Sequence, residues 1–196
     1  MPRGFTEGEK KRIITLLRQE GQKLFLQYGL KRVTIEQLAQ AARIAKGSFY
    51  SFYQSKEELY MDILDFCQRE MYKELEEALR ANRTQGKQLM RAVIRNLLQS
   101  MKRFPLLRRT DQETLELLYR KLPPGVLEKH LSTDTALIEN LMRHGVRFLY
   151  PPELVAKCFQ QAAIAGFQMD QADPDREQVL LLLLEGLVEK VVADEE

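Results

Sequence analysis

The residues best suited to chemistry lie together in one polar stretch, ARIAKGSFYSFYQSKEEL, at positions 42–59. It brings positive charges and aromatic rings within a few residues of one another: Arg43, Lys46, Lys56, Phe49, Tyr50, Phe52 and Tyr53. Lysine and arginine bind phosphate oxygens through charge and hydrogen bonds, and a tyrosine hydroxyl adds a further donor. The stretch therefore indicates binding of a polyanion rather than catalysis.

The sequence has no pattern typical of a catalytic or metal centre. His130 and His144 lie 14 residues apart, without a Cys, Asp or Glu at a usual ligand spacing. A glycine-rich phosphate loop and the HExxH and GxSxG motifs are missing as well. We therefore expect no enzymatic activity, no metal and no cofactor.

Charge is distributed unevenly along the 196 residues. Residues 1–60 carry 11 Lys and Arg against 6 Glu, a net charge of +5, which leaves −3 for the remainder of a chain whose total is +2. This balance suits a basic, polyanion-binding head on an acidic body. Because the apolar runs are too short for a membrane span and the first residues lack a secretion signal, we expect a cytoplasmic protein.

Helical periodicity runs through nearly the whole chain, and proline and glycine fall mainly at the breaks, which predicts an all-α fold. Capping-box spacing marks three helix starts, at Thr6 with Glu9, Thr34 with Gln37, and Ser55 with Glu58. About nine helices are expected. They span residues 6–28, 34–42, 46–52, 55–83, 86–103, 111–121, 125–144, 152–169 and 175–193.

Two of these expected helices, at 34–42 and 46–52, are short and separated by a turn of about three residues. The second carries small, polar and basic side chains. Such a pair forms a helix-turn-helix, whose second helix fits the major groove of DNA and presents its N-terminal residues to base edges. Many helical hairpins share this outline, so the local residues must decide.

The local residues resemble the tetracycline-repressor (TetR) family of bacterial transcriptional regulators. The resemblance runs over residues 12–64 and is carried by LFLQYGLKRVTIEQLAQAARIAKGSFYSFYQSKEELYMDIL. This segment has Phe and Gly before a Thr-capped helix, then Lys-Gly-Ser-aromatic-Tyr and Ser-Lys-Glu-Glu-Leu in the family's order. The resemblance implies a helix-turn-helix DNA-binding domain of three helices at 1–54, and a helical domain at 55–196 that senses a ligand and dimerises.

The resemblance also implies which residues meet double-stranded DNA: Thr34, Arg43, Lys46, Gly47, Ser48, Tyr50 and Lys56. Two positions depart from the family pattern, since Arg43 replaces the usual turn glycine and Ala45 replaces the usual Ser or Thr cap. If the turn keeps a positive φ, Arg43 there costs about 1 kcal/mol. Alternatively, the turn takes a different path, or Arg43 adds a phosphate contact of its own.

For the C-terminal part, the resemblance implies an inducer site and a homodimer. The inducer site is expected to include Cys67, Met71, Met101, Phe104, Tyr119 and Met142. The dimer interface is expected on the last two helices, at Phe159, Ala163, Leu180, Leu183, Leu184 and Leu187. The function implied is that of a repressor released from a palindromic operator by a small, apolar ligand. The alternative is a helical ligand carrier or protein-interaction module that has lost DNA binding.

Overall fold

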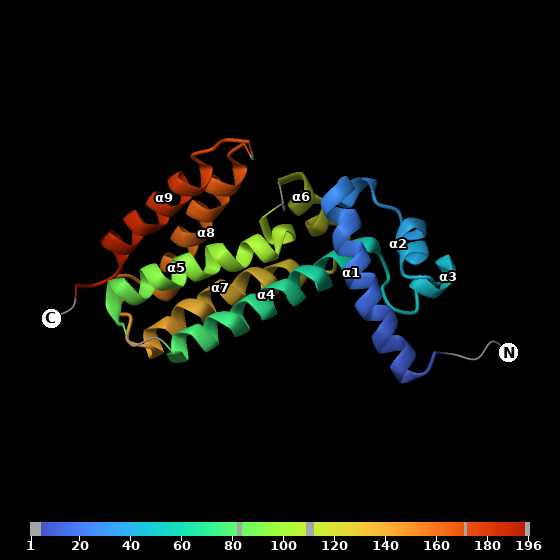
Figure 1. Ribbon diagram of the computed structural model, residues 1–196, viewed down its shortest axis with the longest axis horizontal. Helices are drawn as coiled ribbons and strands as arrows, with labels where there is room; N and C mark the ends of the chain where they lie inside the picture. Colours follow the sequence, from blue (N-terminus) through green and yellow to red (C-terminus); the bar gives the residue numbers. More distant parts are fainter. Residues whose placement is uncertain (1–4, 82–83, 109–111, 171, 195–196) are drawn as a thin grey trace. The chain divides into compact units, whose positions relative to one another are not determined.

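The structure, a computed structural model, describes residues 5–81, 84–108, 112–170 and 172–194. Within them the chain forms nine α-helices and one 3-10 helix (Figure 1): α1 (Glu7–Arg32), α2 (Ile35–Ala41), α3 (Lys46–Phe49), α4 (Lys56–Ala81), α5 (Gly86–Arg103), η1 (Pro105–Arg108), α6 (Gln112–Lys121), α7 (Val126–Arg143), α8 (Pro152–Gln168) and α9 (Arg176–Val191). The predicted all-α fold is confirmed. In these ranges, no helix combines the length and the apolar character that a membrane span requires.

Contacts divide the chain into two compact units. The N-terminal unit comprises Met1–Gln68 and Pro105–Leu127, and the C-terminal unit comprises Arg69–Phe104 and Glu128–Glu196. Helix α4 therefore contributes its first half to one unit and its second half to the other. This division rests on contacts between residues. The predicted boundary between a DNA-binding domain at 1–54 and a ligand-sensing domain at 55–196 is a functional one, and it stays a prediction.

Capping boxes fix the starts of α1 and α2. The Thr6 hydroxyl accepts a hydrogen bond from the Glu9 N–H at 3.3 Å, and the Glu9 carboxylate accepts one from the Thr6 N–H at 2.8 Å. Thr34 and Gln37 form the same pair of bonds at 3.2 and 2.9 Å. The bond from the Thr6 N–H is the main cause of the lowered pKa of Glu9. Both predicted boxes are confirmed, because local hydrogen bonding alone determines them.

Two helix ends differ in detail from the expectation. Gly29 interrupts α1 with φ 76° and ψ 158°, but a further helical turn follows it, so α1 ends at Arg32 rather than at residue 28. At the start of α4, the Glu58 N–H donates to Ser55 Oγ at 3.1 Å, whereas the Glu58 carboxylate accepts from the Gln54 N–H. In the third predicted box, the Glu58 carboxylate therefore bonds to the N–H of Gln54, one residue before the predicted partner Ser55.

The core of the N-terminal unit forms where α1 crosses α4. Leu17 and Phe25 of α1 are buried, and Gly21 lies between them on the same face. A Cβ on Gly21 would lie 3.2 Å from Ile63 Cδ1 and 3.3 Å from Leu59 Cδ2. The missing side chain therefore lets the two helices approach closely.

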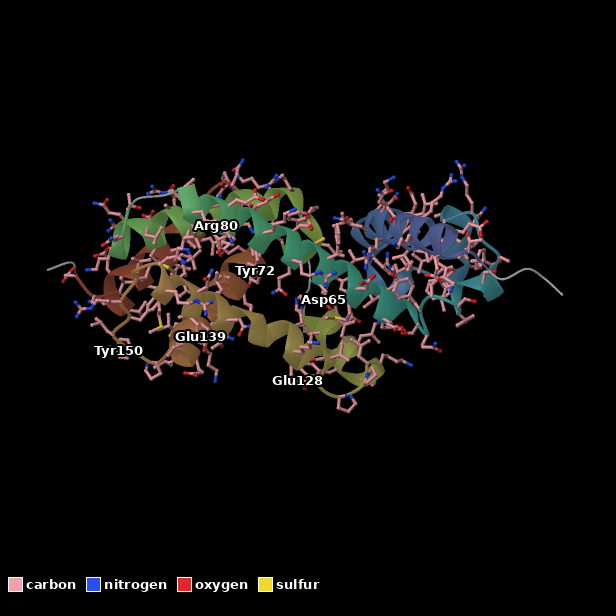
Figure 2. The ribbon with its side chains drawn as sticks, turned by 90° about the horizontal axis from the view of Figure 1, so that it is seen from below. Asp65, Tyr72, Arg80, Glu128, Glu139 and Tyr150 are labelled. Carbon is pink, nitrogen blue, oxygen red and sulfur yellow. The ribbon has the colours of Figure 1, made fainter. Side chains whose placement is uncertain are left out.

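The C-terminal unit has its own core, to which α5, α8 and α9 contribute. Figure 1 shows α8 and α9 side by side, and Figure 2 shows Tyr72 on the second half of α4, where it packs against this core. Ion pairs join α5 to α9 and to the residues after it: Lys87 with Asp194 and Glu189, Arg91 with Glu189, Arg95 with Glu185, and Lys102 with Glu177. The position of α9 is thus fixed by apolar packing and by surface charge.

Close approach between α8 and α9 depends on Gly166. A Cβ at this position would lie 2.6 Å from Leu180 Cδ1 and 3.0 Å from Leu180 Cβ. The buried guanidinium of Arg176 donates from Nε to the Gly166 carbonyl oxygen at 3.1 Å, which satisfies a carbonyl near the end of α8. The helix pair is held by both contacts.

We predict that Gly166→Ala destabilises the protein. The new methyl group must push Leu180 aside, which costs about 1–3 kcal/mol by overpacking and exceeds the gain in helix propensity of at most ~1 kcal/mol. Urea unfolding measures the change. Gly8→Ala in α1 is the control, because a Cβ there meets nothing within 4 Å. Equal stability of Gly166→Ala and the parent would contradict the packing described.

Candidate nucleic-acid interface

The turn between α2 and α3 closes in a Schellman motif. The Ile44 N–H donates to the Ala39 carbonyl oxygen at 2.9 Å, and the Arg43 N–H donates to the Gln40 carbonyl oxygen at 3.0 Å. Arg43 occupies the left-handed position of this motif, with φ 58°. The turn therefore has the positive φ considered for it, although arginine stands where glycine is favoured.

Helix α3 is shorter than the predicted 46–52. Regular helix covers Lys46–Phe49 only, and the chain then continues in turns in which the Phe52 and Tyr53 N–H groups both donate to the Phe49 carbonyl oxygen. Ala45 stands at the N-cap with extended φ and ψ, and its side chain makes no capping bond. This short helix therefore depends on tertiary packing for its stability.

One side of α3 is core and the other is open. Phe49 is 0% exposed, whereas Tyr50 beside it is 47% exposed. Of the seven residues predicted to meet DNA, five lie at the surface of the N-terminal unit and two are half-buried. The exposed residues are Thr34, Arg43, Lys46, Gly47 and Tyr50, and the half-buried residues are Ser48 and Lys56.

Lys56 has structural partners in the free protein. Its ammonium donates to the carbonyl oxygens of Lys31 and Val33, at 2.9 and 2.8 Å, and so ties the start of α4 to the end of α1. Burial lowers the pKa of this ammonium. An ammonium has three N–H donors, so one remains for a phosphate. The predicted phosphate contact of Lys56 stays a prediction.

We call α3 and the turns that follow it, residues 46–53, the recognition segment. An ion-pair cluster holds the end of this segment against α1 and α4. Arg18 donates from Nε and from a terminal nitrogen to the two carboxylate oxygens of Asp62, at 2.7 and 2.8 Å, and the Tyr53 hydroxyl donates to the same carboxylate at 2.6 Å. The Arg18 guanidinium also lies 5.3 Å from the ring centroid of Phe66. Burial is the main cause of the raised pKa of Tyr53. We call Arg18, Asp62 and Tyr53 the clamp.

Comparison with known proteins connects this geometry to a family. The sequence model described as "Bacterial regulatory proteins, tetR family" matches residues 18–63, which contain the helix-turn-helix. The HTH-type transcriptional regulator YhgD of Bacillus subtilis is 34% identical over 64 residues. That alignment covers 33% of this chain and 34% of YhgD, so the chain matches about a third of the length of this relative.

Residues 18–63 of this chain carry the helix-turn-helix domain of the TetR family of transcriptional regulators. Two solved structures share the fold of this chain. A TetR-family regulator of Agrobacterium tumefaciens superposes with a TM-score of 0.68 at 14% identity, over 94% of this chain and 100% of that one. SmeT, the repressor of the Stenotrophomonas maltophilia efflux pump SmeDEF, gives 0.65 at 18% identity, over 94% and 91%. Proteins of this family are not enzymes, as predicted for this chain.

The residues predicted for a TetR-family inducer site fall in both units. Cys67 and Tyr119 belong to the N-terminal unit, and Met71, Met101, Phe104 and Met142 belong to the C-terminal unit. Cys67 and Met71 are buried, whereas Tyr119 and Met142 are 54% and 45% exposed. Burial raises the pKa of the Cys67 thiol to about 11, so this side chain behaves as an apolar group at neutral pH. A shared ligand site stays a prediction.

The predicted dimer residues lie on the packed pair α8 and α9. Leu180 and Leu184 are buried within the unit itself, Phe159, Ala163 and Leu187 are half-buried, and Leu183 is exposed. An open groove of about 730 Å³ lies between the two helices. The groove residues include Leu154, Cys158, Ala162, Leu182, Leu183 and Leu187. Leu154, near the start of α8, was not among the predicted dimer residues.

Sequence reasoning also missed the clamp. Arg18 and Asp62 are 44 residues apart, and neither belongs to a local motif. The only signal in the sequence was Tyr53, which combines an aromatic ring with a hydroxyl in a segment that contributes to the core.

Among the described residues, no group of three His, Cys, Asp or Glu side chains could hold a metal ion.

We predict that Arg43→Gly stabilises the protein by about 0.5–1 kcal/mol, because glycine adopts the positive φ without strain. Urea unfolding measures the difference. Arg43→Ala is the matched control, since it removes the same side chain and keeps the strained backbone. Equal stabilisation by alanine and glycine would show that the side chain, and not the backbone, is responsible.

We predict that Tyr53→Phe costs about 1 kcal/mol at neutral pH, the value of one hydrogen bond. The difference should shrink in alkali. An unfolded tyrosine ionises near pH 10, whereas folding keeps Tyr53 protonated, so its contribution is complete below about pH 10 and is lost as the pH rises toward the raised folded pKa. Unfolding free energies from about pH 7 to 11 test this. Parallel pH profiles for the two proteins would contradict it.

Proposed function

We propose that this TetR-family protein is a transcriptional repressor that binds a palindromic operator as a homodimer and is released by a small, apolar ligand. The observation that carries the proposal is that the recognition segment is buried on one side and exposed on the other. Phe49 is buried in the N-terminal unit, while Arg43, Lys46 and Tyr50 are exposed beside it. Cations and a hydroxyl on the open side of a helix-turn-helix suit phosphates and base edges.

The dimer is proposed from the groove between α8 and α9. Leu154, Leu182 and Leu183 each expose about half of their surface along it, next to the half-buried Leu187. A second copy of the same helix pair would cover these side chains and form a four-helix bundle. Because two heads on one duplex add their binding free energies, a dimer discriminates between sequences far better than one head.

Release by a ligand is proposed through α4. This helix begins at Lys56, beside the recognition segment, and carries Cys67 and Met71 further along. A ligand that favours the non-binding position of α4 by about 2–3 kcal/mol would weaken operator binding roughly 30- to 150-fold. RolR, which has the same fold, was crystallised with resorcinol (TM-score 0.60, 16% identity, over 95% of this chain and 90% of RolR). Its complex supports a small-molecule ligand for a protein of this fold.

The rival function is a helical ligand carrier or protein-interaction module that has lost DNA binding. The open side of α3 speaks against it, since a carrier has no need for exposed Lys46 and Tyr50 above a buried Phe49. The Schellman turn at Arg43 speaks against it as well, because the helix-turn-helix geometry is kept despite an unfavourable residue.

DNA binding is tested with a duplex that the protein itself selects from a random-sequence pool. Binding through six or more phosphates should weaken about 10³-fold or more between about 50 and 200 mM salt. Lys46→Ala should weaken binding and lower the salt slope by about 0.9 per subunit if Lys46 meets a phosphate. Tyr50→Ala should weaken binding at least about tenfold, whereas Tyr119→Ala, which changes an exposed tyrosine on α6, should not. A folded protein that enriches no sequence would support the carrier.

A further inference from the structure

An acidic residue lies on the proposed DNA-reading surface, which consists of the exposed residues predicted to meet DNA: Thr34, Arg43, Lys46, Gly47 and Tyr50. Glu36 lies in the first turn of α2, and its Oε2 is 3.6 Å from the Nζ of Lys46, the first residue of α3. The two side chains are 74% and 61% exposed, so both charged groups are open to an approaching duplex. Between residues 34 and 55 the only formal charges are those of Glu36, Arg43 and Lys46, a net charge of +1.

This pair responds differently to the two parts of DNA. The phosphate backbone offers hydrogen-bond acceptors only, so it attracts Lys46 and repels the Glu36 carboxylate. Base edges in the major groove offer acceptors, such as guanine N7 and O6, and also amino donors, such as cytosine N4. A lysine and a carboxylate held together can therefore both be satisfied at base edges, but not at phosphates.

We propose that Glu36 is a specificity-determining residue, which penalises binding of Lys46 to the DNA backbone and so widens the difference between operator and random sequence. The inference rests on the proposed function. Non-specific binding depends almost entirely on phosphate contacts, so it bears the full repulsion from Glu36 in each subunit. Binding at the operator bears less of it, because base edges replace phosphates as partners of the pair.

The test is Glu36→Gln, which removes the charge and keeps the shape. Affinities are measured for two probes, the duplex that the wild-type protein selects from a random pool and a scrambled duplex of the same length and composition. The variant should bind the scrambled duplex roughly three- to tenfold more tightly. It should bind the selected duplex equally or less tightly, so the ratio of the two affinities falls.

Glu20→Gln is the matched control. It removes the same charge from α1, where Glu20 pairs with Lys23 at 2.7 Å, outside the predicted reading residues. An unchanged affinity ratio in Glu36→Gln, or an equal fall in both variants, would overturn the assignment of Glu36. If the wild-type protein selects no duplex at all, the proposed function fails and this inference fails with it. If the wild type discriminates but Glu36→Gln keeps the ratio, the assignment of Glu36 alone fails.

Discussion

Burial of Phe49 is the constraint on which the proposed DNA-reading surface depends. Helix α3 has only four residues and no side-chain cap, so it has almost no stability of its own. It exists because Phe49 is fully buried on one side, and because the clamp of Arg18, Asp62 and Tyr53 fixes the chain just after it. Buried Phe49 and the clamp therefore position the exposed residues of α3.

Several positive side chains near this surface already have hydrogen-bond or ion-pair partners in the free protein. Lys56 serves as a structural tie between α4 and α1, and Lys46 shares its charge with Glu36. Lys31, near the end of α1, pairs with Glu113 of α6 at 2.6 Å. Much of the positive charge that the composition assigns to the N-terminal third thus has a partner in the free protein. Such a surface depends on geometry and on base contacts more than on an excess of positive charge.

Local signals in the sequence were enough for most of the fold. The capping boxes at Thr6 and Thr34 lie within four residues of chain, and the helical periodicity needs no tertiary information. The clamp could not be predicted in this way, since Arg18 lies 44 residues from Asp62, and Tyr53 and Asp62, nine residues apart, fit no local motif. The outward face of α9 was equally hidden, because leucines on all sides give the helix no preferred direction. Roles in ligand binding depend on cavities between helices, which periodicity does not report.

The central claim is that two heads of this protein read a palindromic DNA site. Hydroxyl-radical footprinting of the purified protein on the DNA upstream of its own gene tests it most directly. We expect two protected half-sites related by two-fold symmetry, with centres about 34–36 Å or a multiple of this distance apart. Absence of protection by folded protein at low salt, or protection that follows no sequence, would contradict it.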